Sequence, residues 1–180
     1  MRSLVAGIAT ALLVAVTVRA QEPPKPAPEL AQLKVFDGTW LCEGNSPAGP
    51  FGPAHKTRSA VQTRLDLDGF WYTTAVTEMN TPENPHPIRG VSHSGYDGAV
   101  KQFLMIWVDN FGSWALETSP GWQGDTFLWT GDQYLMGEKV TARDTFAKKS
   151  LMEMTHRFDL NMKGQWSLVV EETCKKQTKK

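Results

Sequence analysis

The chain has 180 residues, in which 19 lysines and arginines balance 19 aspartates and glutamates, and 41% of the residues are hydrophobic. This balance argues against a protein that holds nucleic acid or an anionic membrane surface through a basic field. The apolar content is enough to bury one sizeable core, so we expect a single globular domain with no nucleic-acid partner.

The first 20 residues have the features of a secretory signal peptide. Arg2 precedes the apolar run Leu4–Val18, and Val18-Arg19-Ala20 places small residues three and one positions before a cleavage at Gln21. The run is short for a bilayer core of roughly 30 Å, and an uncleaved membrane anchor is the alternative. We expect residues 1–20 to be removed, leaving a periplasmic or secreted protein with no stable membrane insertion.

The next segments lead into the folded domain. Residues 21–28 contain four prolines, which predicts an extended spacer. Leu30, Leu33 and Phe36 then recur at a spacing that predicts a short helix across one end of the domain. We expect the domain itself to span residues 29–176 and residues 177–180 to form a basic tail.

From Gly38 onward the spacing of turn-forming residues is typical of an antiparallel β protein. Turn sequences such as Asp68-Gly69, Asp97-Gly98 and Gly131-Asp132 separate runs of strand formers, and no helical run is long enough for a parallel crossover. The pattern predicts about ten strands. After the strand that starts at Gly38, we expect them over His55–Leu65, Phe70–Glu78, Gly90–Tyr96, Lys101–Val108, Ser113–Ser119, Thr126–Thr130, Tyr134–Phe146, Leu151–Asp159 and Gln165–Cys174.

The two cysteines indicate how these strands close. Cys42 shares a strand face with Trp40, and Cys174 shares a face with Trp166 in the last strand. In an exported protein the pair predicts a disulfide that joins the first and last strands; two free buried thiols are the alternative. A bond that closes a loop of roughly 130 residues stabilises by about 4–5 kcal/mol in the chain-entropy model.

If the first and last strands are bonded neighbours, the sheet closes on itself into a barrel. The interior of a barrel of about ten strands is wider than side chains easily fill, which predicts a ligand cavity. His156 lies on the apolar face of its strand, where Asp144 or Glu138 are candidate partners for an ordinary hydrogen-bonded core histidine. A neutral imidazole in an apolar lumen can also ligate haem iron. We expect the cavity to be lined by Trp107, Trp114, Trp129, Met154, His156 and Trp166.

Several motifs resemble a bacterial family of secreted proteins of unknown function, number fifteen-seventy-nine, over roughly residues 27–176. They are Gly38-Thr39-Trp40, Leu67-Asp68-Gly69-Phe70-Trp71, Asn84-Pro85-His86-Pro87, Gly95-Tyr96-Asp97, Val108-Asp109-Asn110, Gly121-Trp122 and Glu171-Glu172-Thr173-Cys174-Lys175-Lys176. The Gly-x-Trp is also similar to the one that opens lipocalin barrels. The resemblance implies a calycin-like barrel, distantly similar to the haem carrier nitrobindin and to fatty-acid-binding proteins. The family has no agreed activity, so the resemblance implies no catalytic residues.

No pattern in the chain indicates catalysis. It contains no Gly-x-Ser-x-Gly and no glycine-rich phosphate loop, and its four histidines lack metal-ligand spacing. Lys101–Val108 is apolar on both faces, so we expect the N-terminal segment or a second subunit, in a homodimer, to cover its outer face.

We therefore predict an all-β, up-and-down antiparallel calycin-like barrel of about ten strands with a short N-terminal helix. We expect it to bind a small, largely apolar ligand, with no cofactor, no metal and no enzymatic activity. A haem-binding enzyme acting on reactive nitrogen or oxygen species, with His156 as axial ligand, is one alternative. A ligand-free structural or accessory envelope protein is the other.

Overall fold

The computed structural model describes residues 22–49 and 51–178. The predicted signal peptide, residues 1–20, lies outside this range. Within it the chain forms one eleven-stranded antiparallel sheet, preceded by a short helix, η1 (Pro28–Phe36), and interrupted by a single turn of helix, η2 (Leu67–Gly69). The strands are β1 (Gly38–Ser46), β2 (His55–Asp66), β3 (Trp71–Glu78), β4 (Arg89–Asp97), β5 (Gln102–Asp109), β6 (Trp114–Ser119), β7 (Trp122–Gln123), β8 (Thr126–Leu135), β9 (Glu138–Lys148), β10 (Glu153–Met162) and β11 (Gln165–Lys176).

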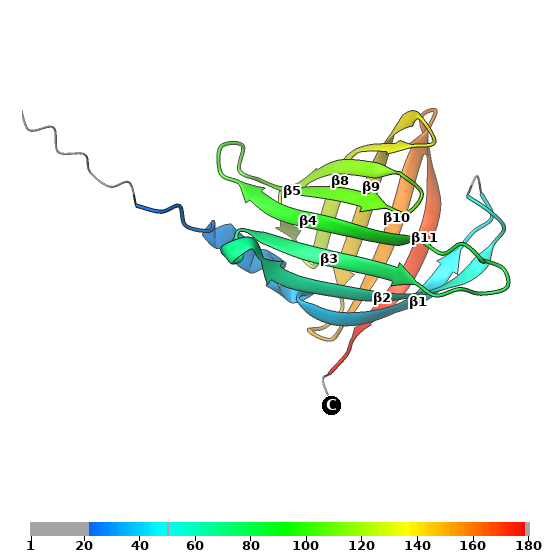
Figure 1. The fold of residues 1–180 in the computed structure, drawn as a ribbon, viewed down its shortest axis with the longest axis horizontal. Helices are drawn as coiled ribbons and strands as arrows, with labels where there is room; N and C mark the ends of the chain where they lie inside the picture. The colour runs from blue at the N-terminus through cyan, green and yellow to red at the C-terminus, as the bar shows by residue number, and fades with distance from the viewer. Residues whose placement is uncertain (1–21, 50, 179–180) are drawn as a thin grey trace, which may run out of the picture.

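Ten of these strands close into a barrel (Figure 1). Strands that follow one another in sequence are neighbours from β1 to β6 and from β8 to β11. The ring is completed by β1 against β11 and by β6 against β8, while the two-residue β7 pairs with β8 alone among the described strands. The predicted closed, up-and-down antiparallel barrel is therefore confirmed.

The predicted disulfide is present at the β1–β11 junction. Cys42 and Cys174 are paired directly across the two strands, and their sulfurs are bonded to each other. The bond is buried with Trp40 of β1 and Met154 of β10. The first and last strands are thus joined covalently as well as by hydrogen bonds.

The N-terminal helix is not confirmed as an α-helix. The segment Pro28–Phe36 is a short 3₁₀ helix, which has about three residues per turn, and the apolar residues Leu30, Leu33 and Phe36 recur at that spacing. Leu30 and Leu33 are buried against a cluster of aromatic side chains that fills one end of the barrel. Figure 1 shows η1 at this end, opposite the long connections from β1 to β2 and from β3 to β4. We call this packed end the floor and the opposite end the mouth.

One predicted turn is wrong. Gly131-Asp132 lies inside β8, and the chain reverses instead at Met136-Gly137. At Gly131 a side chain would collide with the backbone of Leu116 and Glu117 in β6. This glycine therefore permits the close strand approach that completes the ring, rather than a turn.

The outer face of β5 is not covered by the described part of the N-terminal segment, residues 22–36, whose helix η1 lies at the floor. Val108 is flanked by Val91 of β4 and Trp114 of β6, and all three side chains are substantially exposed. Trp114 in turn stacks on Tyr134 of β8, with ring centroids 4.0 Å apart. The expected cover by the N-terminal segment is therefore wrong, and cover by a second subunit stays a prediction.

Candidate functional site

A cavity of about 670 Å³ occupies the barrel between the floor and the mouth. Toward the floor it is lined by Trp40, the Cys42–Cys174 bond and Met154, beside the aromatic cluster over η1. Its mouth is formed by residues of the connecting loops, among them Phe51, Asn84, His86, Phe111 and Met136. The volume lies in the range of small-molecule sites, so the lumen is the candidate functional site.

Four of the six predicted lining residues face this cavity: Trp107, Trp129, Met154 and His156. Trp107 packs across Gly90 of β4, where any side chain would collide with its indole, and donates its ring N–H to Asp109 over 3.1 Å. Trp129 is almost fully buried in the aromatic cluster above η1. Hydrophobic alternation therefore located much of the wall correctly.

Trp114 does not line the cavity. The inward residues of β6 are Ala115, Glu117 and Ser119, and all three are almost fully buried, whereas Trp114 is 45% exposed on the outer face. This strand has its small and polar residues inside and its large apolar residues outside. The usual expectation from alternation is reversed here, which is why the prediction for Trp114 is wrong.

Trp166 also lies outside the cavity, because a β-bulge changes the facing of β11. Phe158 of β10 pairs with Val170, but Asp159 pairs with Leu168, so Val169 is an extra residue. Val169 and Val170 both line the cavity, and residues before the bulge face the opposite way from the predicted alternation. Trp166 is consequently 42% exposed on the outer surface, where Arg143 lies over its ring.

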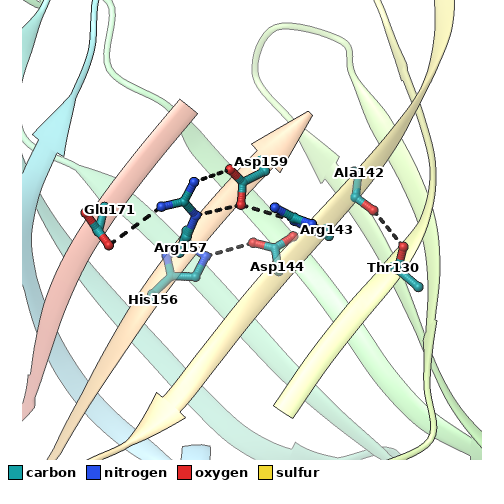
Figure 2. A network of polar contacts seen from close by, with 8 residues as sticks. All are labelled: Thr130, Ala142, Arg143, Asp144, His156, Arg157, Asp159 and Glu171. Atoms are coloured by element: carbon teal, nitrogen blue, oxygen red, sulfur yellow. Dashed lines mark hydrogen bonds and ion pairs between the residues drawn. The ribbon is translucent and has the colours of Figure 1, made fainter. Parts of the chain in front are cut away.

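His156 is the centre of an ionic cluster on the cavity wall. Its Nε2 lies 2.7 Å from Oδ1 of Asp144 on the neighbouring β9, and its Nδ1 lies 3.4 Å from Oε2 of Glu172 on β11. Figure 2 shows the imidazole pointing to Asp144 across the two strands. Phe146 stacks on the imidazole, with centroids 4.6 Å apart. Asp144 is thus confirmed as a partner of His156, whereas the other candidate, Glu138, is exposed at the start of β9.

The two carboxylates keep His156 protonated. Burial alone would lower the pKa of the imidazole, but hydrogen bonds to Asp144 and Glu172 and their negative charges outweigh it and raise the pKa to about 9. Burial would likewise raise the pKa of Glu172, but the bond and charge of His156 reverse this and lower it. The cluster therefore contains an imidazolium held between two carboxylates.

Glu117, which the sequence did not single out, is the least exposed carboxyl group of the cavity wall. Its side chain is 1% exposed, and its Oε2 has no hydrogen-bond partner among the described residues. Burial, reinforced by the charge of Asp144 and opposed by that of His156, raises the pKa of Glu117 to about 9. Glu117 is therefore a neutral carboxylic acid at pH 7. A signal was present in the sequence, since Glu117 alternates with Ala115 and Ser119 in a strand that is apolar on its other face.

The ionisable groups that line the cavity are acidic apart from histidine. They include five carboxyl side chains and, among the described residues, no lysine or arginine. The acidic residues are Glu78, Asp109, Glu117, Asp144 and Glu172. Near the mouth, Glu78 lies 3.7 Å from the ring of His55 and accepts hydrogen bonds from Asn84 and from the backbone of Ile88.

The arginines nearest to this cluster belong to a separate network on the outer face. Asp159 accepts two hydrogen bonds from Arg157, of 2.8 and 2.7 Å, and one of 3.3 Å from Arg143 (Figure 2). Hydrogen bonds from Arg157 and then Arg143 outweigh burial and lower the pKa of Asp159. Both guanidinium groups are bound to Asp159 on the outer face of the barrel, so neither places a positive charge in the lumen.

One further group of potential metal ligands consists of Cys42, Cys174 and Glu172. Its two sulfurs are bonded to each other and supply no thiolate, so the group does not form a metal site.

No helix in residues 22–49 and 51–178 is long and apolar enough to cross a membrane.

Comparisons with known proteins place this barrel in a family. No curated protein matches the chain in sequence. The crystal structure of Rv2717c from M. tuberculosis is similar in fold, with a TM-score of 0.67 and 13% identity, over 86% of this chain and 100% of that one. At this identity the likeness shows the fold alone. A family model described as "Protein of unknown function (DUF1579)" matches residues 25–176, and the chain therefore belongs to the DUF1579 family.

Proposed function

We propose that this protein is an exported, calycin-like barrel that binds a small, largely apolar molecule in its lumen. The observation that carries the proposal is the cavity of about 670 Å³, which is closed at the floor and lined by aromatic and aliphatic side chains. A barrel filled by its own side chains would leave no such space, so the cavity favours ligand binding over a purely structural role.

The residues at the mouth of the barrel are evidence for an apolar ligand. Met136 is 86% exposed and has a left-handed backbone, with φ of 51°, at the turn between β8 and β9. A large apolar residue is disfavoured there by both its exposure and its conformation. Phe51 and Phe111, from two other loops, are exposed at the same mouth. An apolar rim of this kind suits the entry of an apolar molecule from water.

Export is supported by the disulfide between β1 and β11, because such bonds form and persist in oxidising compartments. The features of a signal peptide in residues 1–20 point the same way. The two together support a periplasmic or secreted location.

The lumen does not fit the haem alternative. An axial histidine must offer a free ring nitrogen, whereas both nitrogens of His156 face carboxylates and the raised pKa of the imidazole keeps both protonated. The acidic wall also lacks, among the described residues, an arginine or lysine to pair with the carboxylates of a haem. We therefore infer that the ligand is not haem.

A fluorescent probe tests the proposal directly. We expect the neutral dye N-phenyl-1-naphthylamine to bind the purified mature protein, and Ser92→Phe, which places a ring inside the lumen, to weaken binding by about tenfold or more. Val91→Phe adds the same ring to the outer face of the same strand and should leave binding unchanged. Absence of dye binding, or equal loss in both variants, would contradict lumenal binding, and a Soret band on addition of haemin would revive the alternative.

A further inference from the structure

We propose that the ligand of this barrel carries a protonated amine or another cationic group, which contacts Glu117 on the lumen wall beside Asp144 and His156. This inference rests on the proposed function and names the chemistry of the ligand. It is carried by two independent observations, the unpartnered carboxyl of Glu117 and the charges that line the cavity.

The first observation is that Glu117 is buried without a complete set of partners. Buried polar atoms in native proteins almost always have a hydrogen-bond partner, whether from protein, water or ligand. Oε2 of Glu117 lacks one among the described residues, although the side chain is only 1% exposed and faces the cavity. A ligand that donates hydrogen bonds at this point would satisfy it.

The second observation is that the lumen offers nothing to an anion. Among the described residues its wall has no lysine or arginine, and its imidazolium, His156, is already held between Asp144 and Glu172. The arginines of β9 and β10, Arg143 and Arg157, are bound to Asp159 on the outer face. A fatty acid or another carboxylate would therefore bury its charge without a partner, which is strongly unfavourable.

A bound cation would both give the carboxyl of Glu117 a partner and match the acidic character of the cavity wall. When an ammonium group lies against Glu117, the carboxyl releases its proton to solvent and forms a charge-assisted hydrogen bond. The raised pKa of Glu117, which the charge of Asp144 helps to maintain, means that this proton is present on the free protein at pH 7. The groups that face the new ion pair are then Asp144, His156 and Glu172, whose charges sum to one negative unit. Their net field favours a cation.

The rest of the wall defines the body of the ligand. Met105, Trp129, Phe158 and Leu160 line the same cavity and present apolar surface. Such a wall contacts an aliphatic or ring-containing body by burial of apolar area, while one polar group fixes its orientation. The class is thus an amphiphilic amine rather than a fatty acid or a neutral lipid.

Three probes with the same chain test this assignment: decylammonium, decanol and decanoate, each below its micellar concentration and measured by calorimetry at neutral pH. We expect decylammonium to bind most tightly and decanoate most weakly. Glu117→Gln should weaken decylammonium by roughly tenfold or more, the size expected of a charge-assisted hydrogen bond, and leave decanol nearly unchanged. Glu171→Gln, which removes a carboxylate from the outer face of β11, is the matched control and should alter none of the three.

Decanol also reports whether Glu117→Gln retains an intact cavity. Failure of all three probes would overturn the proposed function, whereas decanol binding with no preference for decylammonium would overturn only the cationic ligand. Equal decylammonium affinity in wild type and Glu117→Gln would likewise overturn the cationic ligand and leave the proposed function standing.

Proton release gives a second readout that a structural role of Glu117 would not affect. Calorimetry in two buffers of different ionisation enthalpy should show about one proton released per decylammonium bound to the wild type and none for Glu117→Gln. An unchanged proton count in the variant would assign the proton to another group and contradict the role of Glu117.

Discussion

Cys42 and Cys174 are opposite each other in the β1–β11 ladder, with Cα atoms 3.9 Å apart, although 132 positions separate them in sequence. The bond therefore links the first and last strands of the barrel, which no turn connects. Its effect on stability is the first prediction. The Cys42→Ala/Cys174→Ala double variant should be less stable to urea by about 4 kcal/mol, because the unfolded chain regains the entropy of a long loop.

Reduction of the wild type under native conditions serves as the control for that variant, and should shift the unfolding midpoint in the same direction. A loss of less than about 1 kcal/mol in the double variant would show that the hydrogen bonds of the junction suffice without the bond.

Stability should fall as pH rises from about 5 to 9. The pKa of Glu117 is raised from 4.5 to about 9, so the native protein holds a proton that the unfolded chain has lost, and its stability decreases through this window. His156, raised from 6.5 to about 9, contributes stability that is fully present below pH 6.5 and lost as pH approaches 9. Urea unfolding at a series of pH values measures both effects.

Glu117→Gln separates the two contributions. The variant should lose the decline between pH 4.5 and 6.5 and show a shallower decline between 6.5 and 9, where His156 still contributes but Glu117 no longer does. If the variant follows the wild-type curve throughout, the buried acid is not the group that titrates.

Gly131 should tolerate no side chain. In Gly131→Ala the new methyl group meets the backbone of β6 at Leu116 and Glu117, and we expect a loss of about 2–3 kcal/mol, measured by urea unfolding. Gly98→Ala is the control, because a side chain there has no neighbour within 4 Å and no positive φ to resist it, and its effect should stay within about 0.5 kcal/mol. Similar losses in both would show that the β6–β8 junction is not tightly packed.

The two faces of the barrel should respond differently to loss of tryptophan. Trp129→Ala removes a ring from the cavity wall and should weaken N-phenyl-1-naphthylamine binding by about tenfold and stability by roughly 3 kcal/mol. Trp166→Ala removes a ring from the outer surface beyond the bulge and should leave dye binding unchanged. Loss of binding in Trp166→Ala would mean that its indole reaches the lumen.

Local patterns were sufficient for much of this structure. Turn residues and alternation predicted the antiparallel barrel, and a pair of cysteines in the first and last strands of an exported chain predicted the disulfide. The face that Cys174 was expected to share with Trp166 is not shared, because the bulge at Val169 lies between them. The apolar face of β10 placed His156 in the lumen, and Asp144 was identified as its partner. These features depend on period two, which the sequence displays directly.

The errors arise where contacts between strands, rather than the local pattern, decide the facing or the role of a residue. Val169 is an extra residue that no local signal marks, and it moves Trp166 from the inner to the outer face. Gly131 resembles a turn residue, yet its small size is required by a strand that lies more than ten positions earlier in the chain. Glu117 alternates with two small residues in its strand, but a carboxyl group is ordinarily expected in water, and its burial follows from the closure of the ring.

The β1–β11 junction also determines where the folded domain begins and ends. β1 begins, and β11 ends, at the floor, where Lys176 reaches the carbonyl of Val35 and Gln177 donates to Thr39. A purification handle or surface linker fused at the carboxyl terminus therefore projects away from the opening of the lumen. Protein immobilised in this way on a sensor chip presents its entrance to the solution, unobstructed by the tether.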